Sequence, residues 1–168
     1  MGGCFVVNET NAPTQALSCL YRLDGAAQPA TGWPAEGIAL NSLSPGDGRV
    51  GVVADGLGGA YVSYRNGFGI AAPQGLYAKH FAADGTPAPG WTSAGVRLSG
   101  TGQESKIVRS GSDAIVAWTD DRHPGQGVYA QRLVTDGPVP TQLSLVSATS
   151  DGVCVALRWY ARSRLWKS

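Results

Sequence analysis

The densest group of side chains that could do chemistry lies in the segment reading TDDRHPG. Asp120, Asp121 and His123 supply two carboxylates and an imidazole, the groups that bind a cation or act as general acid and base. The alternative is a solvated connector in which Asp120 or Asp121 pairs with Arg122 or Arg132. We favour the connector, because the corresponding segments elsewhere in the chain carry other polar residues instead.

No other constellation points to a reaction. His80 occupies the position at which related segments carry Arg22 and Arg132, so a structural hydrogen-bond donor explains it better than catalysis. The sequence contains no Ser/His/Asp spacing, phosphate loop or HExxH motif. We therefore assign no catalytic residue, no metal site and no cofactor, and the question of enzyme activity stays open.

Aromatic side chains are numerous enough to build a platform on which sugars stack, but their fixed repeat positions favour packing in the core. They are Trp33, Tyr64, Tyr77, Trp91, Trp118 and Tyr129. A second group, Trp159, Tyr160 and Trp166, lies among basic residues, as in a nucleic-acid patch. A terminal strand explains this group better. The net charge of +1 also gives no long-range attraction to nucleic acid.

These side chains must be positioned by a repeated unit. Residues 77–98 (YAKHFAADGTPAPGWTSAGVRL) match residues 19–40 (CLYRLDGAAQPATGWPAEGIAL) at a constant offset of 58. The first part of this stretch recurs at residues 129–137 (YAQRLVTDG), at an offset of 52. A period of this size is typical of repeat architectures. The units span about residues 1–43, 44–100 and 101–140.

Each unit predicts about four short strands, and no segment predicts a helix. Apolar runs bounded by glycine, such as GGAYVS from Gly58, are typical of strands covered on both faces. The Asp-Gly dipeptides at 24–25, 84–85 and 136–137 predict equivalent tight turns. Trp33 and Trp91 are expected to close the ends of their units. The predicted fold class is all-β, with four-stranded antiparallel units.

Variable polar connectors join two strands in each unit, at residues 9–17, 65–75 and 119–127. The second and third leave equivalent hairpins, so we expect them to lie side by side on one rim. Variable loops on a repeated scaffold are where specificity is usually placed. The alternative is that these loops are only spacers. The candidate ligand-binding residues, taken as exposed, are Arg65, Asn66, Gln74, Asp120, Asp121, Arg122 and His123.

Composition limits the remaining function classes. The 168 residues include 24 glycines and 10 prolines, which fits many short strands and turns. No run of about 18 apolar residues exists, so no membrane span is expected. The N-terminus lacks the layout of a signal peptide. The three cysteines lack metal-site spacing, and a disulfide between Cys4 and Cys19 is left open.

The repeated segments GGAYVSY, LYAKHF and DGTPAPGW, with AWTDDR and YAQRL, resemble the propeller-type repeats of large secreted bacterial proteins. The resemblance covers residues 2 to about 137 and implies a partial β-propeller of about three blades. Residues 141–168 are either degenerate last strands or the start of a module similar to fibronectin type III. The chain reads as a fragment, because a propeller needs four or more blades to close.

The resemblance implies a secreted or cell-surface location, and it says little about activity. The leading expectation is a non-catalytic binding or scaffold module whose ligand class is a glycan. The alternative is a fragment of a sialidase-like or other glycoside hydrolase propeller. Open strand edges would have to be covered, so we expect the chain to associate with itself or with further blades of a longer chain.

Overall fold

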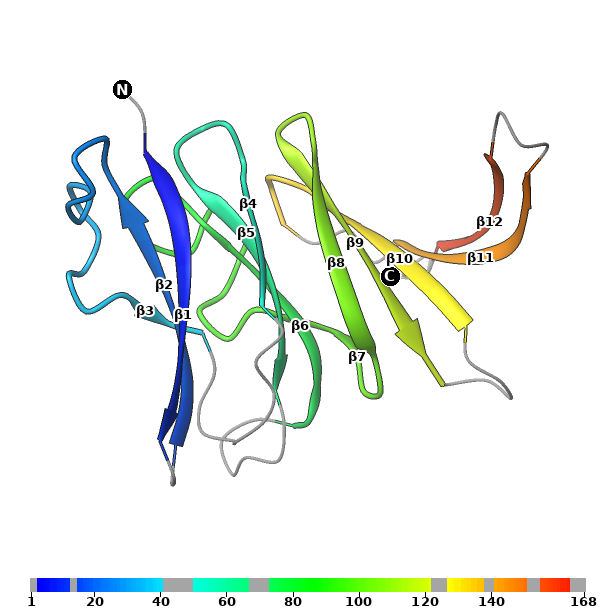
Figure 1. Cartoon of the computed structure of the whole chain (residues 1–168). Helices are drawn as coiled ribbons and strands as arrows, with labels where there is room; N and C mark the ends of the chain where they lie inside the picture. Colours follow the sequence, from blue (N-terminus) through cyan, green and yellow to red (C-terminus); the bar gives the residue numbers. More distant parts are fainter. Residues whose placement is uncertain are drawn as a thin grey trace, which may run out of the picture.

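A computed structural model describes residues 3–12, 15–40, 50–66, 73–121, 127–137, 141–150 and 155–163, with side chains for residues 3–8, 18–40, 50–66, 73–121 and 127–137. Strands arranged in antiparallel sheets make up this part of the chain, and it contains no helix (Figure 1). Consequently no described helix could cross a membrane. The predicted all-β class is confirmed.

The strands form a row of three sheets. The first has the order β1-β2-β3 and comprises β1 (Cys4–Ala12), β2 (Gln15–Leu23) and β3 (Ile38–Ala39). The second has the order β4-β5-β6-β7 and comprises β4 (Gly51–Ala54), β5 (Ala60–Asn66), β6 (Gly75–Phe81) and β7 (Val96–Ser99). The third has the order β12-β11-β10-β9-β8 and comprises β8 (Gln103–Ser110), β9 (Asp113–Asp120), β10 (Gly127–Leu133), β11 (Thr141–Ser150) and β12 (Val155–Ser163).

Strand pairing reproduces the sequence repeat. Phe5 pairs with Arg22, Tyr61 with His80 and Ile115 with Arg132 in the three central hairpins. Equivalent residues therefore face each other in every sheet. The first sheet has no counterpart of β4 and β8 among the described strands. In the third sheet β11 pairs with β10 as β7 pairs with β6, and β12 is an additional strand. Only the second sheet has the predicted four strands.

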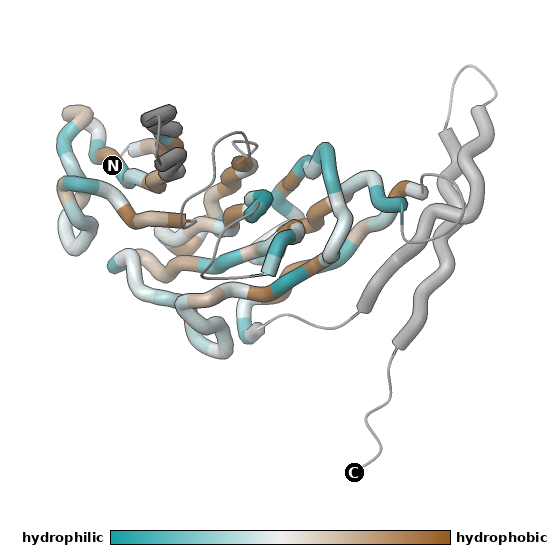
Figure 2. The backbone as a smooth tube through the Cα atoms, turned by 90° about the horizontal axis from the view of Figure 1, so that it is seen from below, coloured by the Kyte–Doolittle hydropathy of each residue, from teal (hydrophilic) through white to brown (hydrophobic). Residues whose placement is uncertain are grey.

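The core lies between neighbouring sheets. Every residue of β6 is buried, as are all but one of β5, so both faces of the second sheet are covered as predicted. Val62 and Tyr64 pack in the cluster with the first sheet, whereas Tyr61 packs in the cluster with the third sheet. Figure 2 shows apolar stretches recurring along the strands, which is what burial on two faces requires.

Trp33 and Trp91 join successive repeats. Both rings are buried. The indole Nε1 of Trp33 donates to the carbonyl oxygen of Ala83 at 2.9 Å, and that of Trp91 donates to the carbonyl oxygen of Val134 at 3.3 Å. Each tryptophan thus forms a hydrogen bond with the next repeat, at the turn that follows β6 for Trp33 and at the turn that follows β10 for Trp91. These residues do more than close a unit, because each also fixes the spacing between two units.

The turn that follows β2, β6 and β10 differs from one sequence expectation. Its left-handed position is Ala27 in the first repeat (φ 59°), Gly85 in the second (φ 82°) and Gly137 in the third (φ 123°). These positions follow the offsets of 58 and 52, so the Asp-Gly dipeptide at 24–25 is not equivalent to the one at 84–85. The hydrogen bond from the backbone N–H of Ala27 to the carbonyl oxygen of Asp24 has its equivalent in the bond from Gly85 N–H to the carbonyl oxygen of Ala82. The repeat offset therefore predicts the position of this turn correctly, whereas the Asp-Gly dipeptide does not.

One further expectation is wrong, and one question left open by the sequence is answered. Residues 9–17 are mostly strand, because β1 and β2 remain paired out to Ala12 opposite Gln15. A disulfide between Cys4 and Cys19 does not form, since Cys4 lies opposite Leu23 and Cys19 opposite Asn8, and both thiols are free. The third cysteine, Cys154, lies outside the described residues.

We predict that Ala27→Gly stabilises the protein by about 0.5–1 kcal/mol. A left-handed backbone costs a residue with a Cβ about 1–2 kcal/mol, and the extra unfolded-state entropy of glycine offsets part of the gain. Urea denaturation measures the change. The matched substitution is Gly85→Ala, which should destabilise, because its Cβ would also lie 3.1 Å from Ile38 Cδ1. Equal effects of both substitutions would contradict the positional equivalence.

Candidate functional site

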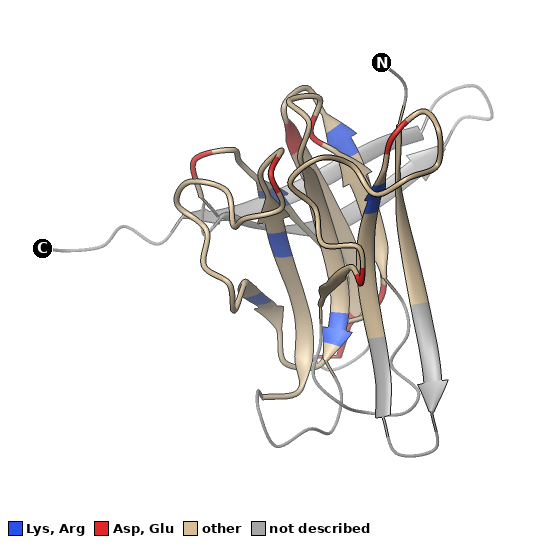
Figure 3. Cartoon of the chain, turned by 90° about the vertical axis from the view of Figure 1, so that its left-hand side faces the viewer, with Lys and Arg blue, Asp and Glu red and all other residues tan. Residues whose placement is uncertain are grey.

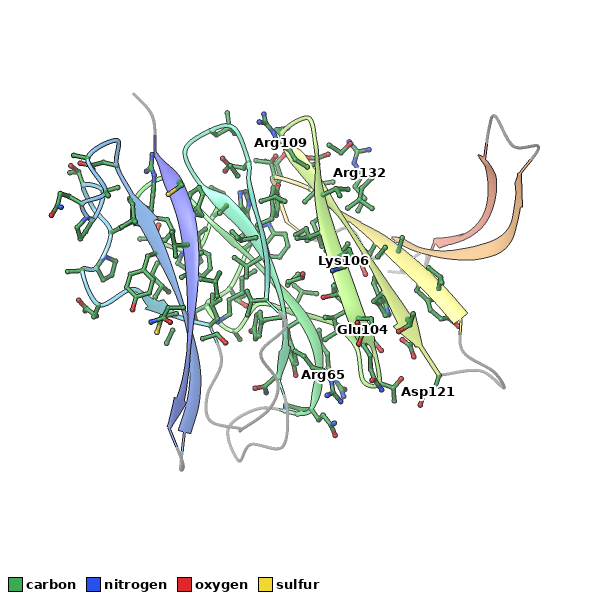
Figure 4. All side chains as sticks on the ribbon, viewed as in Figure 1. Arg65, Glu104, Lys106, Arg109, Asp121 and Arg132 are labelled. Atoms are coloured by element: carbon green, nitrogen blue, oxygen red, sulfur yellow. The ribbon has the colours of Figure 1, made fainter. Side chains whose placement is uncertain are left out.

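The two candidate connectors open at the same end of the sheets. The hairpin β5–β6 ends with Asn66 opposite Gly75, and β9–β10 ends with Asp120 opposite Gly127. Figure 4 places Arg65, Glu104 and Asp121 toward this end, which we call the connector end, and Arg109 and Arg132 toward the opposite, turn end. Arg122 and His123 lie outside the described residues.

Asp120 is a buried structural acid. Only 2% of it is exposed, although it ends its strand. Its carboxylate accepts hydrogen bonds from the Ser99 hydroxyl at 2.5 Å, the Thr101 hydroxyl at 2.6 Å and the indole Nε1 of Trp118 at 3.0 Å. Ser99 belongs to the second sheet, so Asp120 ties the second and third sheets together. An acid held by three donors is stabilised as the carboxylate and serves the fold.

Two expectations about these residues are corrected. Asn66, like Asp120, is buried, so neither belongs to an exposed rim. Arg132 pairs with Asp113 at the turn end, with guanidinium–carboxylate distances of 2.5 and 2.8 Å, and not with Asp120 or Asp121. The physical reason is the strand direction, since Asp120 and Arg132 lie at opposite ends of the β9–β10 hairpin.

The accessible part of the connector end is small. Asp121 and Glu104 are exposed, while Arg65 and Gln74 are partly buried. Arg97 donates to the backbone oxygen of Gln74 at 2.5 Å, and this bond fixes the start of β6. The side chain of Gln74 takes no part in it. Figure 3 shows that the positions of Lys and Arg and those of Asp and Glu are scattered along the ribbon among uncharged residues. This end can therefore offer hydrogen bonds and isolated charges to a ligand.

A second polar group lies at the turn end, buried between the second and third sheets. His80 Nε2 lies 3.0 Å from Asp55 Oδ2, with only 2% and 3% of the two residues exposed. The other oxygen of Asp55 accepts from the backbone N–H of Leu57 at 2.7 Å and of Gly59 at 2.9 Å. The ring of Tyr61 stacks on His80 with centroids 3.8 Å apart. These contacts assign His80 the structural role predicted for it.

The Asp55–His80 pair and the Asp113–Arg132 pair follow one rule. In the second and third sheets, the basic residue of β6 or β10 contacts a carboxylate from the neighbouring hairpin turn. The two acids come from different places, because Asp55 begins a five-residue turn (55–59), whereas Asp113 begins β9 after a two-residue turn. His80 is buried and Arg132 is exposed, and in both cases a turn residue supplies the carboxylate.

Burial shifts the pKa of Tyr61 and of Lys79 in opposite directions. Burial raises the pKa of Tyr61, and the carboxylates of Asp113, Asp55 and Asp136 raise it further. Desolvation lowers the pKa of Lys79, whose Nζ donates to the Leu40 carbonyl oxygen at 3.0 Å. These groups pack between sheets, so the shifts report core packing and not a catalytic arrangement.

The aromatic residues considered as a sugar platform are buried in the described core, as the packing interpretation predicted. Trp118 is 1% exposed and Tyr77, the most exposed of the six, only 8%. No group of three or more His, Cys, Asp or Glu side chains that could hold a metal ion occurs in the described ranges.

Sequence reasoning missed the partners of the buried acids. Ser99 and Thr101 lie 21 and 19 residues before Asp120 and carry no motif. Comparison of the repeats did not identify Asp55 and Asp113 as equivalent acids, because they do not occupy the same repeat position. The usable signal was the basic residue itself, since the residue at this strand position contacts a nearby acid in both the second and the third sheet.

No known family, curated protein or solved structure gives a match to this chain.

We predict that Asp120→Ala destabilises the fold by about 3 kcal/mol. It leaves three buried or partly buried donors without their acceptor, and each lost bond to a charged group costs about 1.5–3 kcal/mol before relaxation. The matched control is Asp121→Ala at the adjacent exposed position, for which we expect a change within about 0.5 kcal/mol. Urea denaturation compares the two. Similar costs for both substitutions would refute the structural assignment of Asp120.

We also predict a pH-dependent contribution from Lys79. Because its folded pKa is lowered from 10.5, the unfolded state binds more protons between the folded pKa and 10.5. Stability should therefore rise with pH through that window, and Lys79→Met should abolish the rise. Denaturant titrations of both proteins from about pH 8 to about pH 10 measure the difference. A difference independent of pH would contradict the assigned shift.

Proposed function

We propose that this chain is a non-catalytic binding or scaffold module built of propeller-type blades, with a glycan as the ligand class. One observation carries the proposal. The acids and bases best placed for chemistry are held by hydrogen bonds or ion pairs of the fold, which join Asp55 to His80, Asp113 to Arg132, and Asp120 to the side chains of Ser99, Thr101 and Trp118. Polar groups at the connector end remain for recognition.

The propeller arrangement is part of the same proposal. Three features support it: equivalent strand pairs recur in each sheet, sheets pack face to face through equivalent positions, and a Gly-Trp segment bridges two successive pairs of repeats. A ring of such units needs more blades than three. We therefore propose that further blades of a longer chain, or a second copy, cover the outer sheets. A secreted or cell-surface location goes with the proposal.

A glycoside hydrolase of the sialidase-like or another propeller type is the second candidate. It is favoured by Glu104 and Asp121, exposed acids at the same end of the sheets. Glu104 also has a left-handed backbone (φ 50°), a strained conformation found often at functional sites. The binding function is preferred because Asp120, the third acid here, is committed to the fold.

We predict binding without turnover when the protein is tested on a glycan array and on a panel of chromogenic glycosides. Asp121→Asn and Gln74→Ala should each weaken a glycan signal about tenfold, the size of a lost hydrogen bond to a charged or well-placed polar group. The matched control is Glu36→Gln, an exposed acid in the first repeat. Glycoside turnover abolished by Asp121→Asn would establish the hydrolase, and no glycan signal at all would refute the ligand class.

A further inference from the structure

Arg97 is an exposed cation at the connector end that belongs to no sequence motif. It lies in β7, where it pairs with Tyr77 near the start of β6. Its guanidinium donates to the backbone oxygen of Gln74, the residue directly before β6. The first residue of β6, Gly75, lies opposite Asn66 where the connector opens. Arg97 therefore lies at the same end of the sheets as the polar groups proposed for ligand binding.

The fold does not require an arginine at this position. At the repeat offset of 58, Arg97 corresponds to Ala39. Ala39 pairs with Cys19 as Arg97 pairs with Tyr77, so the first sheet builds the equivalent strand pair with alanine. The sheet geometry alone therefore does not explain why the second repeat carries a cation here.

Most of the hydrogen-bonding capacity of Arg97 is unused. A guanidinium has several N–H donors in a planar fork, and the bond to Gln74 uses one of them. Within the described chain the other donors have no partner, and no carboxylate forms an ion pair with this residue. By contrast, Arg132 is paired with Asp113. Arg97 is thus available to bind an anion.

Two glycines hold the guanidinium of Arg97 in place. A Cβ at Gly75 would lie 2.8 Å from its Nε, and a Cβ at Gly100 would lie 3.0 Å from its Nη2. Both distances are shorter than an ordinary van der Waals contact, so the guanidinium lies against the backbone only because neither residue has a side chain. Together with the bond to Gln74, this packing orients the group. A group that is oriented before binding loses less conformational entropy when the ligand arrives.

Polar groups suited to sugar hydroxyls lie on the neighbouring strand ends. Ser99, two residues after Arg97, donates to Asp120, so the end of β7 lies beside the end of β9, where Asp121 follows. Asp121 is exposed, and the partly buried Gln74 carries a side-chain amide. One unpaired guanidinium beside an exposed acid provides little attraction for a densely charged polyanion. It suits a ligand with a single, isolated negative group.

We propose that Arg97 binds the carboxylate of an acidic sugar, and that the glycan recognised at the connector end carries such a sugar among neutral ones. A carboxylate is the matching anion, because its two oxygens accept a bidentate pair of bonds from the planar guanidinium fork. The Gln74 amide and the Asp121 carboxylate then bind hydroxyl groups of the same sugar or its neighbour. This inference rests on the proposed glycan-binding function and adds the charge of the ligand to it.

The test uses the full chain on an array of uronate-containing glycans, each beside its carboxyl-reduced form, in which the uronate has become the neutral sugar. We expect a signal from the acidic glycans and a loss of at least about tenfold on reduction. Arg97→Ala should cause a loss of the same size. Arg97→Lys should cause a smaller one, because lysine keeps the charge and lacks the bidentate fork. Urea denaturation checks that both variants fold.

Arg109→Ala is the matched control. Arg109 is also exposed, and its side chain also donates to one backbone carbonyl oxygen, that of Gly111 at 2.6 Å. It lies at the turn end, so its removal takes the same charge from the opposite end of the sheets (Figure 4). We expect Arg109→Ala to leave the signal from acidic glycans unchanged. An equal loss in both variants would reveal a general charge effect and overturn the assignment of Arg97.

The negative results separate this site from the proposed function. A signal from neutral glycans that Arg97→Ala leaves unchanged would overturn the carboxylate site and leave the binding function standing. A signal from acidic glycans that survives carboxyl reduction would have the same meaning. No signal from any glycan, acidic or neutral, would refute the proposed function and the carboxylate site with it.

Discussion

The packing of one sheet between two others is the constraint on which the rest of the structure depends. Residues that alternate along β5, such as Tyr61 and Val62, bury their side chains against different neighbouring sheets. A sheet that is apolar on both faces cannot leave either face in water, so each unit requires another unit on each side. Trp33 and Trp91 link the units further, because each adds a hydrogen bond from one repeat to the next.

This constraint explains how much of the fold was predictable. The run at residues 58–63 is apolar apart from Ser63, and it correctly indicated a strand covered on both faces, whereas in β9 buried residues alternate with partly buried ones. The Asp-Gly dipeptides misled, because a dipeptide is a local signal, whereas the turn position is fixed by the packing of the whole repeat. Ala27 occupies the left-handed position there despite its Cβ. Residues 9–17 also misled, since polar residues can continue a hairpin as well as a loop.

The candidate site was less predictable for a physical reason. Whether an aspartate is exposed depends on its neighbours in space, and the hydroxyls that bury Asp120 come from a preceding segment of the chain. The sequence did locate the basic position shared by Arg22, His80 and Arg132. It could not locate the acids, because the charge requirement fixes where a carboxylate must lie in space and not which turn residue supplies it.

The shared basic position also ties the turn end to the strands of two sheets. The basic residue of the central hairpin of the second and third sheets contacts a carboxylate at the turn end, and in the second sheet that carboxylate directly follows β4. Strand and charge therefore form one unit of structure.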